Sequence, residues 1–342
     1  MRNLNLGLLV CFRVATMPEA GGGHVSRCLV VAQSFRKLGC KCQFIIDTKN
    51  PSIIERLEAA NYEVLVNDIT QSGVNYDIVI MDSYYLDDND ISYWRSHSRF
   101  LVAFDDQDCL QNIVDLRIVP YLAAGKSYTG SSHTLSGITY IPVHDEYATA
   151  QRSNKDGSLH CAVSFGLRDG CGATLIALDA LNSLKSIHPN LRVSCFIGTG
   201  SPHLSAIKRK IASMSSFSEL HINSSSLART FSDVDIAIGA GGLGLYERMC
   251  MGLPNIVVTI ADNQQSLASW ADTRGGVRLL GAAKDVGLSN MIEAIEHLIA
   301  TPDERQRLGK VAQELCDGRG ADRISQAVME LFNSNVTKNL DF

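Results

Sequence analysis

The alternation of short apolar runs with segments of helical periodicity is the feature of this sequence that most restricts its fold. In the first half, strand-like apolar runs lie near residues 6–12, 42–46, 63–66, 77–82 and 100–104. Helical periodicity connects most of them, and a second series of the same kind begins near residue 160. Strands that alternate with helices form parallel sheets with crossover helices. The sequence therefore predicts an α/β fold with doubly wound sheets, whose ligands bind beyond the carboxyl ends of the strands.

The length and composition of the chain indicate two folded domains. Its 342 residues exceed one ordinary domain, and 45% of them are apolar while 20% are charged, as is usual for folded proteins. Between residues 121 and 158 the alternation gives way to Gly, Ser, Thr and isolated aromatics, which is typical of a turn-rich linker. We therefore expect an N-terminal domain over residues 1–150 and a C-terminal domain over residues 151–342.

The charge balance and the cysteines argue against several classes of protein. A formal net charge of -5 at pH 7 argues against a nucleic-acid binder, because such binding depends on neutralising phosphates. Of the ten cysteines only Cys40 and Cys42 are closely spaced, and no second spaced pair accompanies them, so no metal site is indicated. No basic segment followed by a cleavable apolar core signals export. We expect a cytoplasmic protein with reduced thiols that needs no metal, cofactor or membrane.

A glycine turn separates the first strand-like run from a segment of helical periodicity. Its sequence, GGGHVSRCL over residues 21–29, places His24 at the expected start of a helix. The free N–H groups and the dipole of a helix N-terminus favour a bound anion, and they also favour the neutral form of an imidazole. His24 is then either a structural residue that packs at the turn or a general base. Arg27, one turn later, could bridge to a carboxylate at a strand end, such as Asp82 or Asp105.

A second glycine loop joins a strand-like run to a helix in the C-terminal half. The stretch GAGGLGLYE over residues 239–247 has four glycines, which let a ligand approach the backbone closely, and a carboxylate early in the helix. The loop N–H groups suit a diphosphate and Glu247 suits ribose hydroxyls, a division of labour known from dinucleotide sites. The simpler interpretation is a tight turn with a glutamate that the helix dipole favours.

Motifs in both halves, in the same order along the chain, resemble those of one known family. The segment 21–29, with Arg13 eleven residues before His24, is similar to the motif G-x-G-H-x-x-R-C-L. The residues GAGG at 239–242 with Glu247, GLP at 252–254 and ADNQ at 261–264 are similar to G-A-G-G…E…G-L-P…A-x-N-Q. Further matches are Asp82-Ser83-Tyr84, Asp105-Asp106 and DGRGADR at 317–323. The chain thus resembles the PseG family of nucleotide-sugar hydrolases, which includes the UDP-2,4-diacetamido-2,4,6-trideoxy-β-L-altropyranose hydrolases of pseudaminic acid synthesis.

The resemblance implies the GT-B architecture, in which two Rossmann-like domains face each other across a cleft. The C-terminal domain would hold the nucleotide and the N-terminal domain the sugar. His24 would act as general base on a water that attacks the anomeric carbon of a UDP-sugar and expels UDP with inversion. Substrate contacts are implied for Gly22, Gly23, Asp82, Tyr84, Asn263 and Gln264. Nucleotide contacts are implied for Phe165, Gly166, Gly241, Gly242, Leu243 and Glu247.

Simpler interpretations of these residues stay open. Asp82 and Tyr84 could merely form a turn at a strand end, and Tyr85 competes for a role against the sugar ring. Asn263 and Gln264 could be only a helix cap, although their amides have the donors and acceptors for sugar hydroxyls or amides.

The chain departs from the family pattern at positions near the expected sugar. Ala15 stands where the family usually has aspartate, Ser83 where it has histidine, and Leu243-Gly244 replaces a hydroxyl-bearing pair. The family's G-G-x-D turn is represented by Gly166 and Asp169. These differences suggest a different sugar more readily than an inactive enzyme, and they weaken the assignment of the nucleotide.

Three functions therefore stay open. The first is hydrolysis of a UDP-linked amino or deoxy sugar. The second is a glycosyltransferase of the same architecture, resembling the MurG type, that passes the sugar to an acceptor. The third is a non-catalytic nucleotide-sugar binder. No basic amphipathic helix for a lipid acceptor is visible in the N-terminal half, which favours hydrolysis. The number of chains in the assembly stays open.

Overall fold

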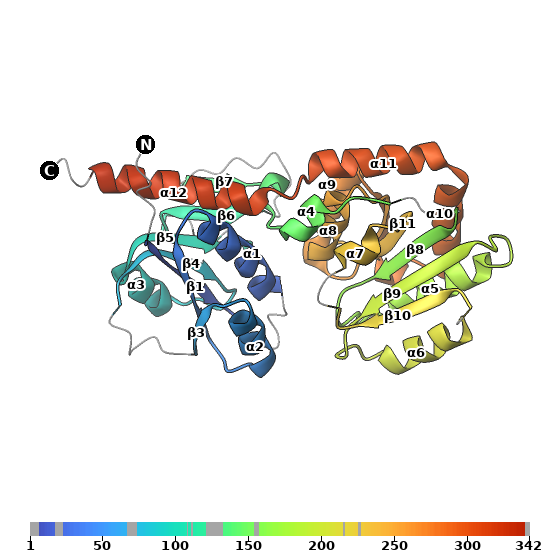
Figure 1. The fold of residues 1–342 in the computed structure, drawn as a ribbon, viewed down its shortest axis with the longest axis horizontal. Coiled ribbons are helices and arrows are strands. Elements are labelled where there is room, and N and C mark those ends of the chain that lie inside the picture. Colours follow the sequence, from blue (N-terminus) through green and yellow to red (C-terminus); the bar gives the residue numbers. More distant parts are fainter. Residues whose placement is uncertain are drawn as a thin grey trace. The chain divides into compact units, whose positions relative to one another are not determined.

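The chain divides into two compact units, each built around one parallel sheet (Figure 1). The first unit comprises residues 1–143 and 319–342, and the second comprises residues 144–318. The computed structural model describes residues 7–17, 23–66, 74–107, 109–110, 112–120, 133–153, 157–214, 216–224 and 227–338. For residues 336–338 it describes the backbone alone.

The sheet of the first unit has the strand order β3-β2-β1-β4-β5-β6-β7, and every neighbouring pair is parallel. The order reverses direction between β1 and β4, which makes this pair the topological switch point where open α/β sheets bind ligands. The strands are β1 (Leu9–Val14), β2 (Lys41–Ile46), β3 (Glu63–Val66), β4 (Tyr76–Asp82), β5 (Ser98–Phe104), β6 (Leu116–Val119) and β7 (His133–Ser136).

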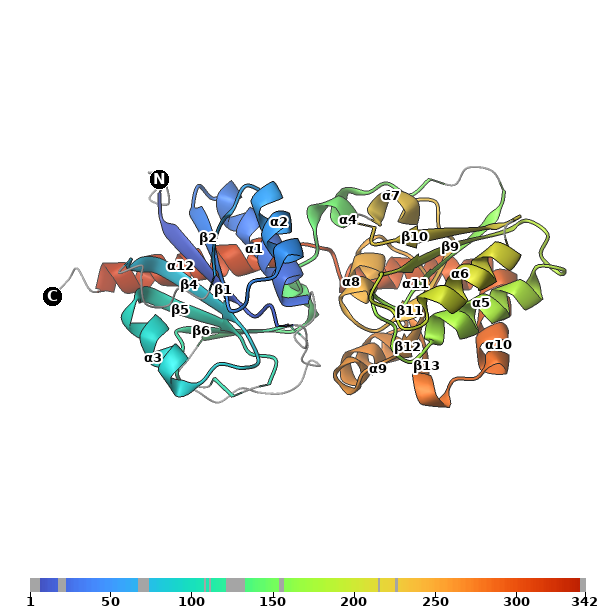
Figure 2. The same ribbon diagram turned by 90° about the horizontal axis from the view of Figure 1, so that it is seen from below.

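Helices cover both faces of this sheet because its strands are apolar on both sides (Figures 1 and 2). Side chains of α1 and α12 pack with Phe12, Phe44 and Phe100 on one face. Ile91 and Trp94 of α3 pack on the other. The helices are α1 (Gly23–Lys37), α2 (Pro51–Ala59), α3 (Asp88–Ser96), the short 3-10 helix η2 (Ile138–Tyr140) and α12 (Gly320–Lys338).

The sheet of the second unit repeats the Rossmann order, β10-β9-β8-β11-β12-β13, again with parallel pairs throughout. Its switch point lies between β8 and β11. The strands are β8 (Leu159–Ser164), β9 (Leu191–Ile197), β10 (Ser218–Ile222), β11 (Ile236–Ala240), β12 (Asn255–Thr259) and β13 (Arg278–Ala282).

Helices α5, α6 and α10 share one core with this second sheet, and α8 and α9 contact β11, β12 and β13. The helices of the unit are α4 (Asp145–Thr149), α5 (Ala173–Leu184), α6 (Leu204–Ser213), α7 (Ala228–Phe231), α8 (Leu243–Cys250), η3 (Asp262–Gln264), α9 (Gln265–Thr273), η4 (Ala283–Asp285), α10 (Leu288–Ala300) and α11 (Pro302–Leu315).

The C-terminal helix belongs to a different unit from the one that the sequence predicts. Residues 319–342 were expected in a domain spanning 151–342, but α12 packs against α1 of the first unit. Its Ile324, Val328 and Phe332 lie in the core of the first sheet. Helical periodicity identifies an apolar face without identifying the sheet that the face covers, so the boundary could not be placed from the pattern. The first boundary lies at residue 143 rather than 150.

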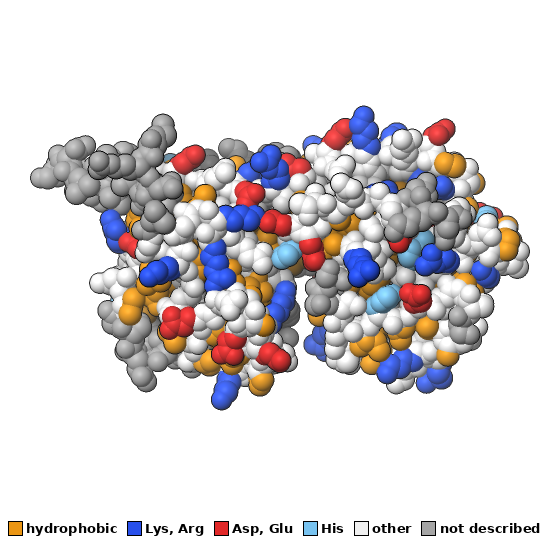
Figure 3. Space-filling view, in the orientation of Figure 1, with side chains coloured by type: hydrophobic (Ala, Val, Ile, Leu, Met, Phe, Trp, Pro, Cys, Tyr) orange, Lys and Arg blue, Asp and Glu red, His pale blue; other side chains and the backbone are white. Residues whose placement is uncertain are grey.

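Charged side chains are interspersed over the face drawn in Figure 3, with acidic and basic groups side by side on each unit. Among the helices that the structure describes, none is long and apolar enough to cross a membrane.

Candidate active site

The first switch point brings the end of β4 beneath the start of α1. Val14, the last residue of β1, pairs with Asp82, the last residue of β4, and the N–H of Ala15 donates to the Asp82 carbonyl at 2.9 Å. The chain then enters α1 at Gly23, so His24 lies in its first turn. Parallel strands end at one edge of the sheet, which is why residues 58 positions apart meet here.

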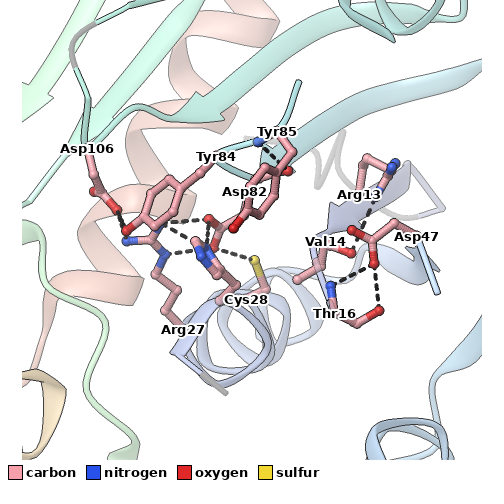
Figure 4. A network of polar contacts seen from close by, with 12 residues as sticks. Arg13, Val14, Thr16, Arg27, Cys28, Asp47, Asp82, Tyr84, Tyr85 and Asp106 are labelled. Atoms are coloured by element: carbon pink, nitrogen blue, oxygen red, sulfur yellow. Dashed lines mark hydrogen bonds and ion pairs between the residues drawn. The ribbon is translucent and has the colours of Figure 1, made fainter. Parts of the chain in front are cut away.

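Five residues at this edge form a connected polar cluster, which we name the His24 network: His24, Arg27, Asp82, Tyr84 and Asp106 (Figure 4). The Asp82 carboxylate lies at its centre. Its Oδ1 is 2.5 Å from His24 Nδ1 and 2.6 Å from Arg27 Nη2, and its Oδ2 is 2.6 Å from Arg27 Nε. Both Asp82 oxygens are thus held by charged or ring nitrogens, with Cys28 Sγ also donating to Oδ2 at 3.4 Å.

The surroundings of Asp82 fix its charge and with it the tautomer of His24. Burial alone would raise the pKa of Asp82, but the Arg27 guanidinium and the hydrogen bonds from Arg27 and His24 outweigh burial and hold this pKa well below its usual range. An ionised carboxylate only accepts hydrogen bonds, so the Nδ1 of His24 carries the proton. The Nε2 of a neutral ring is then an acceptor, and no hydrogen bond among the described residues engages it.

Tyr84 and Asp106 close the network on the outer side. Asp106 Oδ2 accepts from Arg27 Nη1 at 2.8 Å and from the Tyr84 hydroxyl at 2.9 Å. The Tyr84 ring meets the His24 ring edge-on, with 4.6 Å between centroids. Burial and the nearby Asp106 raise the pKa of the Tyr84 hydroxyl, so it remains a neutral donor. A pocket adjoins this side, lined by Ser83, Tyr84, Leu86, Phe104, Asp105, Asp106, Gln107, Cys109 and Leu110.

The structure corrects one expectation about the carboxylates and confirms another. Asp82 was expected to bind substrate, yet its side chain is 0% exposed and both of its oxygens are held by His24 and Arg27. Arg27 bridges to Asp82, one of the two carboxylates considered for it, and also to Asp106, which was not considered. Asp105 is turned to Arg117, whose Nε donates to it at 2.8 Å, and to the N–H groups that follow it.

The remaining residues expected near His24 are partly placed. Tyr84, rather than Tyr85, lies against the imidazole, while the N–H of Tyr85 donates to Ser83 Oγ. Gly23 begins α1. Gly22 lies outside the described residues.

The glycine loop of the second unit, residues Gly239–Leu243, runs from the last two residues of β11 to the first residue of α8. Gly239 passes close to β8: a Cβ there would lie 2.2 Å from the carbonyl oxygen of Ser164, so only glycine fits. Gly242 takes the N-cap position of α8 with an extended backbone. Gln264 fixes the loop, because its Oε1 accepts from the N–H groups of Gly241 at 3.2 Å and Ile260 at 3.0 Å.

Glu247 and Arg248 lie next to each other in α8 but have different surroundings. Glu247 is half-buried and hydrogen-bonds the hydroxyl of Tyr147 in α4. Arg248 is buried under the loop, where its Nε donates to Asn255 Oδ1 at 2.7 Å and its Nη2 to the carbonyl of Ala240 at 2.9 Å.

Of the residues predicted to bind substrate or nucleotide, one lies in the core and another contacts the loop backbone. The Phe165 side chain is 0% exposed in the core of the second sheet, so its ring is closed to a nucleotide. Gln264 uses its amide oxygen on the loop backbone. Asn263 is exposed in η3, and Gly166 has a positive φ of 86° with open space where a Cβ would point. Asp169 caps α5 by accepting from the N–H groups of Ala173 and Thr174.

Sequence reasoning missed three residues of these sites: Asp106 as the partner of Arg27, Tyr147 beside Glu247, and Arg248. The position of Arg248 next to Glu247 could have indicated its burial, because neighbouring helix residues point in different directions. If Glu247 faces a ligand, Arg248 faces elsewhere. Within the described parts of the chain, no group of three or more His, Cys, Asp or Glu side chains is placed to hold a metal ion.

Comparison with known proteins finds distant relatives and a common fold. No family model matches the chain. It is 23% identical over 209 residues to the spore coat polysaccharide biosynthesis protein SpsG of Bacillus subtilis, covering 60% of this chain and 61% of that protein. It is 21% identical over 275 residues to the UDP-2,4-diacetamido-2,4,6-trideoxy-β-L-altropyranose hydrolase of Campylobacter jejuni, covering 78% of this chain and 97% of that enzyme.

Among solved structures, the chain is similar to MurG of Acinetobacter baumannii. The TM-score is 0.66 at 14% identity, with 95% of this chain and 99% of MurG covered. Together with the strand order of the two sheets, this likeness shows the GT-B fold, with two Rossmann-like units.

Proposed function

We propose that this chain hydrolyses a UDP-linked amino or deoxy sugar at the anomeric carbon, releasing UDP and the free sugar. The observation that carries the proposal is the 2.5 Å contact between His24 Nδ1 and the buried carboxylate of Asp82, which leaves Nε2 as a base. The motifs of the PseG family and the similarity to the Campylobacter jejuni hydrolase support the same assignment.

In this proposal the second unit binds the nucleotide. The N–H groups of Gly242 and Leu243 lie at the start of α8, where backbone donors and the helix dipole favour the diphosphate, while the N–H of Gly241 is already held by Gln264. The carboxylate of Glu247 accepts from the ribose hydroxyls, and its hydrogen bond with Tyr147 fixes its orientation. Gly166, in the loop after β8, lets the backbone approach the nucleotide closely.

The first unit supplies the chemistry. His24 Nε2 removes a proton from a water molecule as the water oxygen forms a bond to the anomeric carbon. The bond from that carbon to the phosphate oxygen breaks, and its electron pair leaves with UDP. Asp82 stabilises the imidazolium that forms, which then gives its proton to solvent. One base suffices because a diphosphate held by backbone N–H groups leaves without a general acid.

The sugar is assigned to the side of the network that Tyr84 and the adjoining pocket form. The Tyr84 ring offers an apolar surface beside His24, and Ser83, Gln107 and Asp106 bring polar atoms to the pocket. In the second unit, Asn263 is exposed in η3, and its amide suits a hydroxyl or an amide of a bound UDP-sugar. Ser83 replaces the larger histidine of the family pattern, so we assign a sugar that differs from the family's at this position.

The proposal is tested by incubating the purified protein with a panel of UDP-, GDP- and CMP-sugars in the absence of an acceptor. We expect UDP to be released from at least one UDP-sugar, and the His24→Ala variant to lose about 10²- to 10⁴-fold in rate, which is the usual contribution of a general base. His133→Ala is the matched control, because His133 is exposed on β7 of the same unit.

Each other outcome has a defined meaning. Full release by His24→Ala contradicts the proposed base. Release that requires an added acceptor identifies a glycosyltransferase, in which the same base activates an acceptor hydroxyl. Binding of a UDP-sugar without release under either condition identifies a nucleotide-sugar binder and contradicts hydrolysis.

A further inference from the structure

A guanidinium lies buried directly beneath the glycine loop of the second unit. Arg248 is 1% exposed although it belongs to α8, the helix that the loop begins. Two of its three nitrogens are held from below. Nε donates to the side chain of Asn255 at 2.7 Å, and Nη2 donates to the carbonyl of Ala240 at 2.9 Å. Both acceptors are neutral, so these bonds fix the position of the group without cancelling its charge.

The third nitrogen faces the loop. A Cβ built on Gly239 would lie 3.0 Å from Arg248 Nη1, and one built on Gly244 would lie 3.4 Å from it. The guanidinium therefore lies against both glycines, at ordinary contact distance for a Cβ on Gly244 and closer than that for one on Gly239. Among the hydrogen bonds of the described residues none engages Nη1, so this donor is directed at the loop with no acceptor of its own.

The charge of this group persists at neutral pH. Burial lowers the pKa of Arg248 to about 10, against an opposing effect of Glu247 and Tyr147, and a group with that pKa is protonated at pH 7. The two hydrogen-bond acceptors of Arg248 are neutral, and the nearby Glu247 carboxylate offsets the burial of the cation only in part, because the net shift of the Arg248 pKa is downward. A bound anion above the loop would offset the remaining cost of burial.

We propose that Arg248 is a positioning residue for the diphosphate, one that holds the glycine loop open toward the anion and sets a fixed positive charge beneath it. This inference rests on the proposed function, which supplies the diphosphate. The charge acts through the loop backbone and is present before the ligand arrives, so it requires no rearrangement when negative charge grows on the departing UDP.

The test compares the affinities of UDP and uridine for variants of the full chain, measured by isothermal titration calorimetry. Arg248→Gln removes the charge and keeps an amide that can donate to Asn255, whereas Arg248→Lys keeps the charge. We expect Arg248→Gln to bind UDP at least about tenfold more weakly and uridine as the wild type does. Arg248→Lys should recover most of the lost UDP affinity. Arg229→Gln, exposed on α7 of the same unit, is the matched control.

The outcomes separate this inference from the proposal on which it rests. A wild-type chain that binds UDP, together with an Arg248→Gln variant that binds it equally well, overturns the inference alone. Equal weakening of UDP and uridine also overturns it, because a structural brace acts on the whole site. A wild-type chain that binds no UDP overturns the nucleotide assignment itself. Should Arg248→Gln fail to fold, a folded Arg248→Lys that loses UDP affinity without losing uridine affinity contradicts the role of charge.

Discussion

A buried carboxylate is stable in this protein only because its partners are arranged as one unit. Asp82 is closed to water, and burial of an unpaired carboxylate is strongly unfavourable. Arg27 offsets this with two hydrogen bonds to the two oxygens, and His24 adds a third. The same bonds hold the imidazole in one tautomer and one orientation. Stability and the proposed catalysis therefore depend on the same atoms at this position.

Replacing Asp82 with asparagine tests the coupling between carboxylate and imidazole. The amide keeps the size of the side chain but can present a donor to Nδ1, which favours the tautomer whose Nε2 carries the proton. We expect kcat for release of UDP to fall about 10³- to 10⁴-fold with a much smaller change in KM. Asp77→Asn is the control and should retain activity, because Asp77 lies near the start of the same strand, where its carboxylate pairs with Arg99.

The pH dependence of stability shows whether Asp82→Asn has removed the intended ion pair. In the folded chain the pKa of Asp82 lies below its ordinary value of 3.8. The ionised carboxylate therefore stabilises the folded chain fully above pH 3.8, and this stabilisation is lost as the pH falls toward the pKa of the folded state. The difference in unfolding free energy between wild type and Asp82→Asn should narrow from about pH 5 to about pH 3. A constant difference would mean that another group provides the stabilisation.

Contacts between side chains were predictable where the ends of neighbouring strands bring the residues together. They were not predictable where the conformation of a turn decides them. His24, Arg27 and Asp82 could be placed together because the ends of β1 and β4 meet at one edge of the sheet. Whether Arg27 pairs with Asp105 or with Asp106 depends on the conformation of the turn after β5. It also depends on Arg117 in β6, a strand of four residues that the pattern did not identify. Neighbouring carboxylates in a turn can point either way until the partner strand is known.

At the scale of elements, the glycine loop is defined by how closely two strands approach. Gly239, near the end of β11, lies so close to Ser164 of β8 that a methyl group would lie 2.2 Å from a backbone oxygen. Backbone cannot yield as a flexible side chain does, so the two strands would have to move apart. The loop geometry thus follows from the switch point of the second sheet and not from the loop residues alone.

Gly239→Ala should therefore destabilise the second unit by about 3 kcal/mol, at the upper end of the usual cost of overpacking. Chemical denaturation followed by fluorescence measures this change. Gly170→Ala is the control, because a Cβ at that position meets nothing within 4 Å, and its effect should stay within about 0.5 kcal/mol. Equal stability of the two variants would contradict the close approach of β8 and β11.

The elements that the pattern missed are short or polar. β7 has the sequence HTLS, with one large apolar residue in four, and it lies in the region that we expected to be a turn-rich linker. The long apolar strands were correctly predicted because their burial on both faces requires continuous apolar runs. Phe165 shows the limit of motif transfer. A residue can hold its place in a motif while its side chain lies in the core and only its backbone faces the loop.

At the scale of the whole molecule, each unit carries one part of the proposed reaction at its own switch point. The first has the His24 network between β1 and β4, and the second has the glycine loop beside β8 and β11. Two doubly wound α/β units were predictable from the alternation of elements, and the GT-B architecture was implied by the resemblance to the PseG family. The strand orders and the likeness to MurG show this fold. The packing of α12 on the first unit was not predictable, because an amphipathic helix face can cover either sheet.

The central claim is that water attacks the anomeric carbon, and the fate of the water oxygen tests it most directly. UDP released in water enriched in oxygen-18 is isolated and its mass measured, since phosphate oxygens do not exchange with water under these conditions. Attack at carbon leaves the bridging oxygen with UDP, so we expect UDP without label. Incorporation of one oxygen-18 atom into UDP would mean attack at phosphorus and would contradict the assignment of His24 as the base for glycosyl transfer to water.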